Sequence, residues 1–444
     1  TLFAACELGV FDFLLASERP MSAAQVAAGL GTDVDGMERL LSACAGLELL
    51  GTQAAGGEVL YSNTDMSRMY LSRSSPRSLF HSVEYYSKTV YLCWNYLTDA
   101  VREGKNQYEK AFGLPSEDLF EALYRSDDEM IKFMQLMNST WNVCGRDVMT
   151  AFDLSPFKTI YDLGEAHMNI GFLPQSIKPC PSISGCTSCP CRIPWIWFLL
   201  SAGCSGALAK QCVRAYPQSS VTIFDLPKVV STCREHFVSP TDERIFFHEG
   251  DFFKDLLPEA DLYILARILH DWTDECCVEL LSRVHQSCKP GGGVLLVEAL
   301  LNEDNSGPLT AQLYSLNMLV QTEGRERKAS EYSALLTTAG FANVEVQRTG
   351  KIYDAILARK DHTAAHWDPY DRASGLWHKN LYDVSMSAPS HAPGSLPPFN
   401  VTAALLFNTC IVLPGLTNDG GTDQLSASGS PPGTHSTVYI HYEP

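Results

Sequence analysis

A histidine and two glutamates are spaced so that they could act together in proton transfer. His270 lies in the sequence LHDW, directly after an apolar run typical of a buried strand. Glu298 ends a second apolar run, and Glu326 lies in the polar sequence TEGRER. An imidazole beside carboxylates can serve as a general base, because the acids fix its tautomer and raise its basicity. Most single histidines are structural, so a packing role for His270 stays open.

A further acidic residue closes another apolar run and could bind a nucleoside cofactor. Asp225 ends the sequence VTIFD, about one helical crossover after a glycine-containing loop. Such a carboxylate can accept hydrogen bonds from both ribose hydroxyls, which fits NAD as well as S-adenosylmethionine. Two features favour the methyl donor: Gly250, Asp251 and Phe252 follow the next strand, where adenine would lie, and KPGGG turns into a later strand.

Strand-like and helix-like runs alternate from Thr159 onward and must position these residues. They are TIYDLG, SGALAKQCVRAY, VTIFD, PKVVSTCREHF, RIFFHEG, ADLYILARIL, a helix from Val278 to Cys288, GGVLLVEAL, NVEVQ and YDAILARK. The alternation predicts an α/β fold, a Rossmann-like doubly wound parallel sheet that ends in an antiparallel pair. Ligands of such a sheet bind at the carboxyl ends of its strands, an edge that we call the rim.

The beginning of the chain predicts a small domain of helices and one hairpin. Its expected elements are a helix from Leu2 to Leu15, a helix to Ala28 capped by Ser22, a helix from Met37 to Leu50 begun by Asp33 or Asp35, and a hairpin that turns at Gly56 and Gly57. Three helices and a β wing describe a winged helix. That fold often binds DNA, so a DNA-binding regulator is a competing function. The stretch GMERLLSACAGLELL holds one basic residue, Arg39, and such an apolar helix is expected to pack against another subunit instead.

The composition is that of a globular protein with two or three domains. The chain has 444 residues, of which 45% are hydrophobic, and a formal net charge of −18. Nucleic acid and anionic membranes are therefore poor partners, because contacts to phosphate need clustered Lys and Arg. The most apolar run, Ile193–Ala202, is about half of the roughly 18 to 20 residues needed to cross a bilayer. Residues 1–10 lack the layout of a secretion signal, so we expect a cytoplasmic protein.

Fourteen of the 15 cysteines fall into two groups. Nine are scattered through apolar or helical stretches and are expected to be buried free thiols: Cys6, Cys44, Cys93, Cys144, Cys212, Cys233, Cys276, Cys277 and Cys288. Five crowd into one segment that contains a CxxC: Cys180, Cys186, Cys189, Cys191 and Cys204. Zinc could bind such a segment, but no histidine stands at ligand spacing. No acidic cluster of the magnesium type is evident either, so we expect no metal.

Four longer sequences carry a specific resemblance. LARILHDW, GDFFKDLLPEADLYILAR, SLNMLVQTEGRER and YDAILARK resemble the small-molecule O-methyltransferases that use S-adenosylmethionine, a family related to the plant phenolic methyltransferases. The resemblance runs from Leu2 to Lys360, apart from residues 165–202. It implies a homodimer with a winged-helix-like dimerisation domain, and methyl transfer to a small hydroxyindole, the 5-hydroxyl of N-acetylserotonin, in melatonin synthesis. The sequence, which begins at Thr1, is expected to lack the family's first helix.

The resemblance also implies roles for individual residues. His270 would be the general base, and Glu298 and Glu326 would brace it. S-adenosylmethionine would be held by Tyr124, Trp141, Gly164, Asp225, the backbone of Gly250, Asp251 and Phe252, and Arg267. The indole substrate would face Asp271, Asn317 and Gln321. Core packing of Tyr124 and Trp141 and a capping role of Asn317 stay open. The sulfonium already makes the methyl group electrophilic, so the enzyme must align the reactants and remove one proton.

The chain departs from the family in the cofactor loop. The family's loop runs from an acidic residue through several glycines into a helix, whereas here DLG and GCSGALAK are separated by residues 165–202, and Cys204 replaces a glycine. Glycines in this turn let backbone N–H groups approach the cofactor. We therefore expect the fold to persist while cofactor affinity and activity fall. The alternatives are a catalytically impaired isoform that only dimerises, and a methyltransferase-like paralogue with another hydroxylated aromatic acceptor.

Three regions follow from these patterns. Residues 1–95 are predicted to form the dimerisation domain and linker helices. Residues 96–360 are predicted to form the methyltransferase domain, which the insertion at 165–202 interrupts. Residues 361–444 hold nine of the 24 prolines and half of the 12 histidines without a sustained period, so they are predicted to be a disordered tail.

Overall fold

The computed structural model describes residues 1–113, 126–164, 205–322 and 324–361. Several predictions from the sequence concern residues outside these ranges. They are the cofactor contact of Tyr124, the insertion at 165–202 with its cysteines, the replacement at Cys204, and the tail after residue 361.

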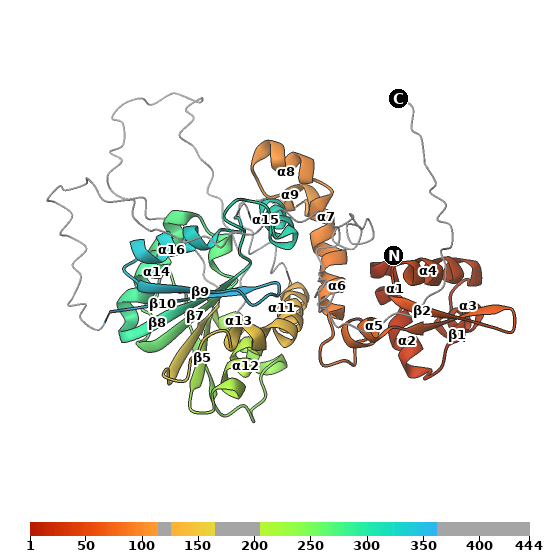
Figure 1. The fold of residues 1–444 in the computed structure, drawn as a ribbon, viewed down its shortest axis with the longest axis horizontal. Helices are drawn as coiled ribbons and strands as arrows, with labels where there is room; N and C mark the ends of the chain where they lie inside the picture. Colours follow the sequence, from red (N-terminus) through yellow and green to blue (C-terminus); the bar gives the residue numbers. More distant parts are fainter. Residues whose placement is uncertain (114–125, 165–204, 323, 362–444) are drawn as a thin grey trace, which may run out of the picture. The chain divides into compact units, whose positions relative to one another are not determined.

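The first part of the chain forms short helices and a three-stranded antiparallel sheet in the order β1-β3-β2 (Figure 1). Its elements are α1 (Leu2–Glu7), α2 (Val10–Ala16), β1 (Met21–Ser22), α3 (Ala23–Leu30), α4 (Val34–Gly46), β2 (Leu50–Ala55), β3 (Glu58–Asn63) and α5 (Asp65–Tyr70). The predicted hairpin is confirmed, and Gly56 and Gly57 take the positive φ of 62° and 84° that its turn needs.

The predicted starts of two helices are confirmed, and the extent of another helix is wrong. Ser22 precedes α3, and its backbone N–H donates to Oε1 of Gln25 at 2.9 Å. Asp33 caps α4, because its carboxylate accepts from the N–H of Gly36 at 2.9 Å. The single helix predicted over Leu2–Leu15 is two helices, α1 and α2. Gly9 separates them with a left-handed φ of 77°, a conformation that a continuous helix does not allow.

A series of helices follows and connects to the α/β part. They are α6 (Phe80–Tyr85), the π-helical turn η1 (Tyr86–Val90), α7 (Tyr91–Trp94), α8 (Leu97–Glu103), α9 (Tyr108–Phe112) and the long α11 (Asp127–Met149). Helix α6 packs against α11, and α7 and α8 pack against α15 (Leu309–Gln321). This packing brings aromatic side chains from residues 80–112 next to helices of the α/β part.

Among the described residues, no helix combines the length and the apolar character that a bilayer crossing requires.

The α/β part contains a seven-stranded sheet in the order β6-β5-β4-β7-β8-β10-β9. Its strands are β4 (Thr159–Leu163), β5 (Ser220–Asp225), β6 (Ile245–Glu249), β7 (Ala260–Ala266), β8 (Cys288–Glu298), β9 (Ala342–Gln347) and β10 (Asp354–Arg359). The first five strands of this order, β6, β5, β4, β7 and β8, pair in parallel. Strand β10 pairs antiparallel with both β8 and β9. The predicted α/β fold with a final antiparallel pair is confirmed.

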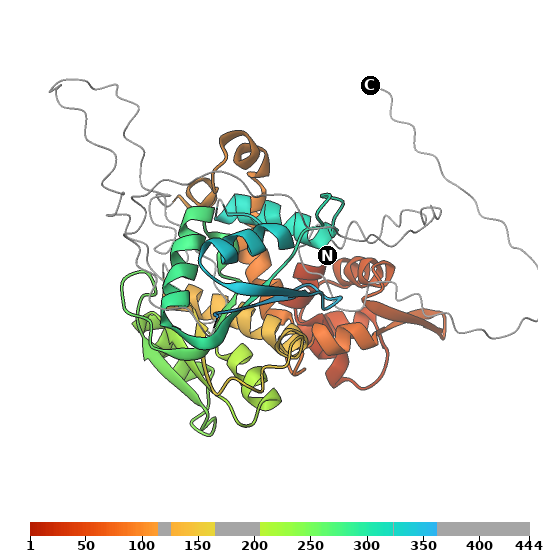
Figure 2. The same ribbon diagram turned by 60° about the vertical axis from the view of Figure 1, so that its left-hand side comes forward.

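Helices cover both faces of this sheet (Figure 2). They are α12 (Ala207–Ala215), α13 (Pro227–His236), the 3-10 turn η3 (Leu269–Asp271), α14 (Asp274–Ser287) and α16 (Ala329–Thr338). Helices α12 and α13 contact β5 and β6, whereas α14 contacts β8 and α16 contacts β9. The strand order runs outward from β4 in both directions, and right-handed crossovers in opposite directions place their helices on opposite faces of the sheet. The central strands are therefore covered from both sides.

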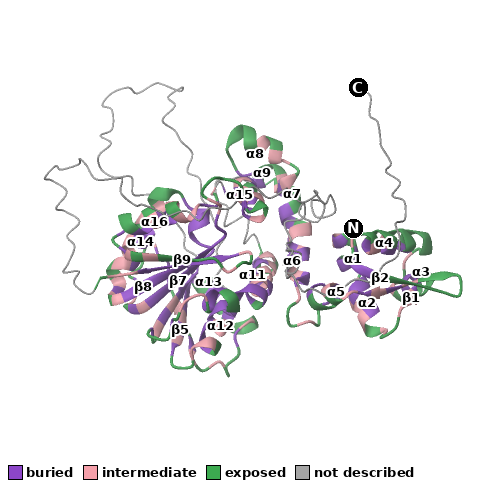
Figure 3. Ribbon diagram, viewed as in Figure 1, coloured by how far each residue is buried: buried purple, intermediate pink, exposed green. Residues whose placement is uncertain are grey.

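Burial on both faces explains the apolar runs of the central strands. Six of the seven residues of β7 are buried, and every residue of β8 from Gly292 to Glu298 is buried (Figure 3). Strand β4 has β5 on one side and β7 on the other, so the strand order reverses there. A crevice at the rim is expected at such a reversal. Asp225 and Glu298, the last residues of β5 and β8, end at this rim.

Two valines of the sheet allow a test of this packing. Val294 of β8 is fully buried, whereas Val346 of the edge strand β9 is 38% exposed. We expect Val294→Ala to lower the free energy of unfolding by about 2 kcal/mol, from about 0.8 kcal/mol per buried methylene-sized group plus a cavity term. Val346→Ala should change it by less than about 0.5 kcal/mol. Urea titrations followed by circular dichroism measure both, and equal losses would contradict the burial described.

Candidate active site

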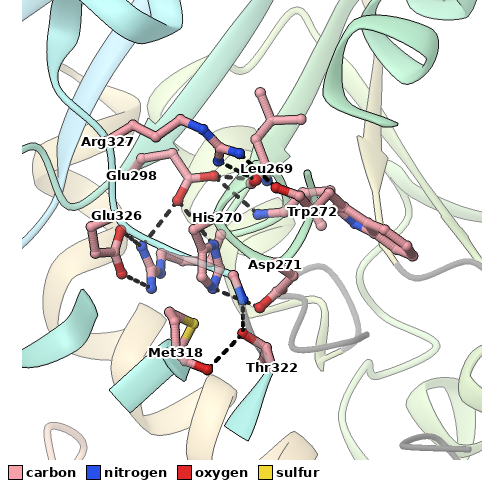
Figure 4. A network of polar contacts seen from close by, with 12 residues as sticks. Leu269, His270, Asp271, Trp272, Glu298, Met318, Thr322, Glu326 and Arg327 are labelled. Atoms are coloured by element: carbon pink, nitrogen blue, oxygen red, sulfur yellow. Dashed lines mark hydrogen bonds and ion pairs between the residues drawn. The ribbon is translucent and has the colours of Figure 1, made fainter. Parts of the chain in front are cut away.

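The candidate general base lies in a short turn directly after β7. Residues Ile268–Trp272, which we call the histidine turn, present His270 at the rim, where it is only 2% exposed. Oε1 of Glu298 accepts hydrogen bonds from the backbone N–H groups of Ile268 at 3.2 Å and Leu269 at 3.0 Å (Figure 4). Glu298 therefore fixes the amino-terminal half of the histidine turn.

Two carboxylates flank the imidazole of His270. Its Nδ1 lies 3.1 Å from Oε2 of Glu298, and its Nε2 lies 3.2 Å from Oδ1 of Asp271. The Nδ1 contact is close in distance but outside hydrogen-bonding geometry, so it becomes an ion pair only when His270 is protonated. The structure thus brings the predicted base His270 together with Glu298. It also places Asp271, which was expected to face the substrate, beside the imidazole.

Glu326, which was expected to brace His270, pairs with Arg267, and the cofactor role implied for Arg267 stays a prediction. Glu326 makes a two-pronged contact with Arg267, whose Nη1 and Nη2 donate to its two carboxylate oxygens at 2.8 and 2.6 Å. Nη1 of Arg267 also donates to Oε2 of Glu298 at 3.0 Å. Glu326 therefore reaches His270 only through Arg267, since an isolated carboxylate is costly to bury and a guanidinium pairs with both of its oxygens. Arg267 takes a left-handed φ of 57°, an uncommon backbone conformation for this residue.

The charge state of the imidazole corrects an expectation from the sequence. Neighbouring acids were expected to raise its basicity, yet the pKa of His270 is lowered well below 6.5. Burial is the largest cause, and the positive charge of Arg267 is the next, whereas the charge of Glu326 opposes them. Burial also raises the pKa of Glu298, against the effect of Arg267. His270 is consequently neutral near pH 7 and can accept a proton.

A second group of acids lies at the ends of β4 and β5. Asp225 is fully buried, and its Oδ1 accepts from the N–H of Leu226 at 2.7 Å. Gly164 lies so close that a Cβ on it would stand 1.9 Å from Oδ2 of Asp225. Asp162 is also fully buried, and neither of its carboxylate oxygens has a hydrogen-bond partner among the described residues. Burial, and then the charge of Asp225, raise the pKa of Asp162 well above 3.8.

This acidic group fits the donors of S-adenosylmethionine. The cofactor offers an ammonium group and two ribose hydroxyls, all of which can donate hydrogen bonds. The unfilled acceptors of Asp162 and the absence of a Cβ at Gly164 are consistent with such a ligand at the rim. Sequence reasoning selected Gly164 and Asp225 but did not select Asp162 as a site residue, although the sequence DLG contained it.

The other predicted cofactor residues that the structure describes lie on different elements. The N–H of Gly250 donates to the carbonyl of Asp225 at 2.9 Å. Asp251 accepts from Nζ of Lys254 at 2.8 Å, and Phe252 is fully buried. Trp141 of α11 is also fully buried, and its ring lies 5.4 Å from that of Tyr353.

The predicted substrate residues of α15 lie one helical turn apart. Asn317 is buried, and its Oδ1 accepts from Nε1 of Trp94 at 2.9 Å. Gln321 is 1% exposed, and its Oε1 accepts from the hydroxyl of Tyr108 at 3.4 Å. Nε2 of Gln321 has no hydrogen-bond partner in the described part of the chain. Trp94 and Tyr108 were missed by sequence reasoning, because nothing in the local pattern of residues 91–112 connects them to a helix more than 200 residues later.

Within residues 1–113, 126–164, 205–322 and 324–361, no group of three or more His, Cys, Asp or Glu side chains is arranged to hold a metal ion.

Comparison with protein families gives matches to both parts of the chain. The model of the O-methyltransferase dimerisation domain matches residues 1–73. The model of the O-methyltransferase domain matches residues 94–173 and 200–342, so its match is interrupted near the middle of the chain.

Individual proteins and a solved structure agree with these matches. The chain is 57% identical to an acetylserotonin O-methyltransferase of Gallus gallus over 359 residues, 81% of this chain and 93% of that protein. It is 51% identical to the protein of the same name from Bos taurus, with the same coverage. The crystal structure of human N-acetylserotonin methyltransferase in complex with S-adenosylmethionine superposes with a TM-score of 0.70 at 49% identity, covering 81% of this chain and 93% of that one. Together with the site geometry, these matches establish that the chain belongs to the S-adenosylmethionine-dependent O-methyltransferases, the family that includes the acetylserotonin O-methyltransferases.

Proposed function

We propose that this protein transfers the methyl group of S-adenosylmethionine to the 5-hydroxyl of N-acetylserotonin, the reaction that forms melatonin. The names of its relatives support the acceptor. The observation that carries the proposal is the neutral, buried imidazole of His270, held between Glu298 and Asp271 at the rim of the sheet.

His270 acts as the general base in this proposal. Bound S-adenosylmethionine supplies a methyl group that is already electrophilic. A phenol with a pKa near 10 does not give its proton to an imidazole spontaneously, since even an ordinary His pKa of about 6.5 leaves a gap of roughly 4.8 kcal/mol. The hydroxyl would become far more acidic as its oxygen bonds to the methyl carbon and the carbon–sulfur bond breaks to leave the neutral thioether, so its proton would move to Nε2 of His270 during that step. Glu298 then stabilises the imidazolium that forms.

The remaining site residues divide between the two ligands. Asp162, Gly164 and Asp225 would receive the polar groups of the cofactor. Asn317 and Gln321 would face the indole, and the Nε2 group of Gln321 can donate to the acetamide carbonyl of the acceptor. Alignment of the hydroxyl and the methyl group between these two sets of residues would contribute to the rate acceleration.

The same proposal covers the organisation and location of the protein. The match of residues 1–73 to a dimerisation domain supports a homodimer. In this proposal, the dimerisation region spans residues 1–95 and the methyltransferase region spans residues 96–360. A cytoplasmic location is supported by thiols that are buried and free, among them Cys44, Cys212 and Cys288, because such thiols persist in a reducing compartment.

A catalytically impaired isoform that still dimerises is the second candidate function. The observation in its favour is the interrupted match of the methyltransferase model between residues 173 and 200, within the cofactor loop. A loop that no longer brings its backbone N–H groups to the cofactor would leave the dimerisation region intact.

Removal of His270 tests the base. We expect His270→Gln to lower kcat for N-acetylserotonin on the order of 10²- to 10⁴-fold, because no other described side chain takes its place. The affinity for S-adenosylmethionine, measured by calorimetry, should stay unchanged. His236→Gln is the matched control, since that side chain is 44% exposed at the end of α13. Equal turnover of the His270→Gln variant and the unaltered chain would exclude the proposed base.

The pH dependence of the reaction tests the charge state of His270. Because its pKa is lowered below 6.5, the neutral imidazole persists as the pH falls and is lost only when the pH passes the lowered pKa. We expect kcat/KM to be flat near neutral pH, with an acid limb centred below 6.5. Rates between about pH 5 and pH 8 measure this limb. An acid limb centred at or above 6.5 would contradict the lowered pKa.

Deletion of residues 165–202 separates the two candidate functions. We expect the shortened chain, in which Gly164 precedes Gly203, to bind S-adenosylmethionine at least about tenfold more tightly, or about 1.4 kcal/mol. Isothermal titration calorimetry of both chains measures the difference. Equal affinities would show that the insertion does not impair the cofactor site.

A further inference from the structure

Arg327 has no part in the mechanism described so far, yet it lies buried behind the histidine turn. Its side chain is 1% exposed and all three guanidinium nitrogens donate hydrogen bonds. Two acceptors are carbonyls of the histidine turn, Leu269 at 2.6 Å from Nη1 and Trp272 at 2.5 Å from Nη2 (Figure 4). These carbonyls stand on either side of His270 in the chain.

The backbone next to Arg327 holds a third carbonyl of the same turn. The N–H of Arg325 donates to the carbonyl of His270 itself at 3.0 Å. The approach is so close that a Cβ on Gly324 would lie 2.2 Å from that carbonyl oxygen and 3.0 Å from Cα of Asp271. Residues 324–327 therefore contact the carbonyl groups of three of the five residues in the histidine turn.

Arg327 and Glu298 hold the histidine turn from its two ends. Glu298 accepts from the N–H groups of Ile268 and Leu269, whereas Arg327 donates to the carbonyls of Leu269 and Trp272. Nε of Arg327 donates to Oδ1 of Asp274 at 2.9 Å, which orients the guanidinium plane. A lysine could not reproduce this arrangement, because a single ammonium group does not offer a planar fork of donors.

We propose that Arg327 is a positioning residue for His270: by fixing the carbonyl groups of the histidine turn, it aims the imidazole at the acceptor hydroxyl. The inference rests on the proposed methyl transfer, in which His270 takes the hydroxyl proton. Arg327 donates to the backbone on either side of the imidazole. Its positive charge also helps to lower the pKa of His270, an effect that Gly324→Ala leaves in place. Reacting groups must lie within a narrow range of distance and direction, so a shift of the turn by about 1 Å is expected to reduce the rate on the order of 10²-fold.

Two variants disturb the turn in different ways. Arg327→Met removes the donors while it keeps most of the side-chain volume, and Gly324→Ala retains Arg327 but places a Cβ against the carbonyl of His270. We expect both to lower kcat, by about 10²-fold for Arg327→Met, while KM and the affinity for S-adenosylmethionine stay unchanged. Gly324→Ala keeps the test valid if Arg327→Met does not fold.

A second acceptor separates positioning from general loss of structure. A ring-fluorinated N-acetylserotonin has a more acidic hydroxyl, so its methylation depends less on the base. The kcat deficit of both variants should therefore shrink with the fluorinated acceptor. Arg244→Met is the matched control, because Arg244 also donates to three backbone carbonyls, those of Val213, Tyr216 and Ser219, away from the rim. A destabilised protein would show the same deficit with both acceptors, and this result would overturn the proposal.

Hydrogen exchange measured by mass spectrometry makes the test independent of turnover. The amides of the histidine turn should exchange faster in Arg327→Met and Gly324→Ala than in the unaltered chain and in Arg244→Met. If the unaltered chain transfers no methyl group, the proposed function fails, and the exchange of the histidine turn still decides whether Arg327 fixes it. Unchanged exchange in both variants would overturn the positioning role, whatever the enzyme activity.

Discussion

The arrangement of the candidate site depends on the burial of one carboxylate, that of Glu298. This group is completely removed from water at the end of the central strand β8, so each of its interactions must come from protein. It receives two backbone N–H groups of the histidine turn, one guanidinium nitrogen of Arg267 and the approach of Nδ1 of His270. The position of the imidazole is thus a consequence of how a buried negative charge is satisfied. Arg267 balances this charge and extends the network to Glu326, which explains why Glu326 has no direct contact with His270.

The acids at β4 and β5 present the opposite situation. Asp162 is buried without a hydrogen-bond partner among the described residues, and Asp225 raises its pKa further. A buried carboxylate that lacks donors is unfavourable, and a ligand that supplies donors relieves this penalty on binding. Cofactor binding should accordingly stabilise the folded chain by mass action, since the unfolded chain has no such site. The two halves of the rim therefore differ: around Glu298 the buried charge is satisfied within the protein, whereas Asp162 leaves buried acceptors unfilled among the described residues.

Much of the fold and part of the site could be predicted from the sequence. Apolar runs such as ADLYILA are diagnostic because both faces of a central parallel strand are buried, and Asp225 and Glu298 end such strands at the predicted rim. The break between α1 and α2 was missed, since a glycine inside an apolar period does not reveal its φ. The lowered pKa of His270 was missed because burial, which depends on the whole fold, exceeds the effect of its acidic neighbours. Contacts such as Glu326 with Arg267 and Trp94 with Asn317 depend on tertiary packing that no local spacing encodes.

Strand β10 lies between β8 and β9 although it is the last of the seven strands in the chain. Its residues Asp354 to Arg359 pair with Glu298 to Gly293, so β8 has an open edge until β10 is in place. During synthesis, β4 to β8 leave the ribosome well before β10, and they cannot form the finished sheet in the order in which they emerge. The strand that ends in Glu298 gains its second neighbour only from a segment that begins 56 positions downstream, as the pairing of Glu298 with Asp354 requires. The complete sheet around the strand that carries Glu298 therefore requires the chain up to Arg359, the end of β10.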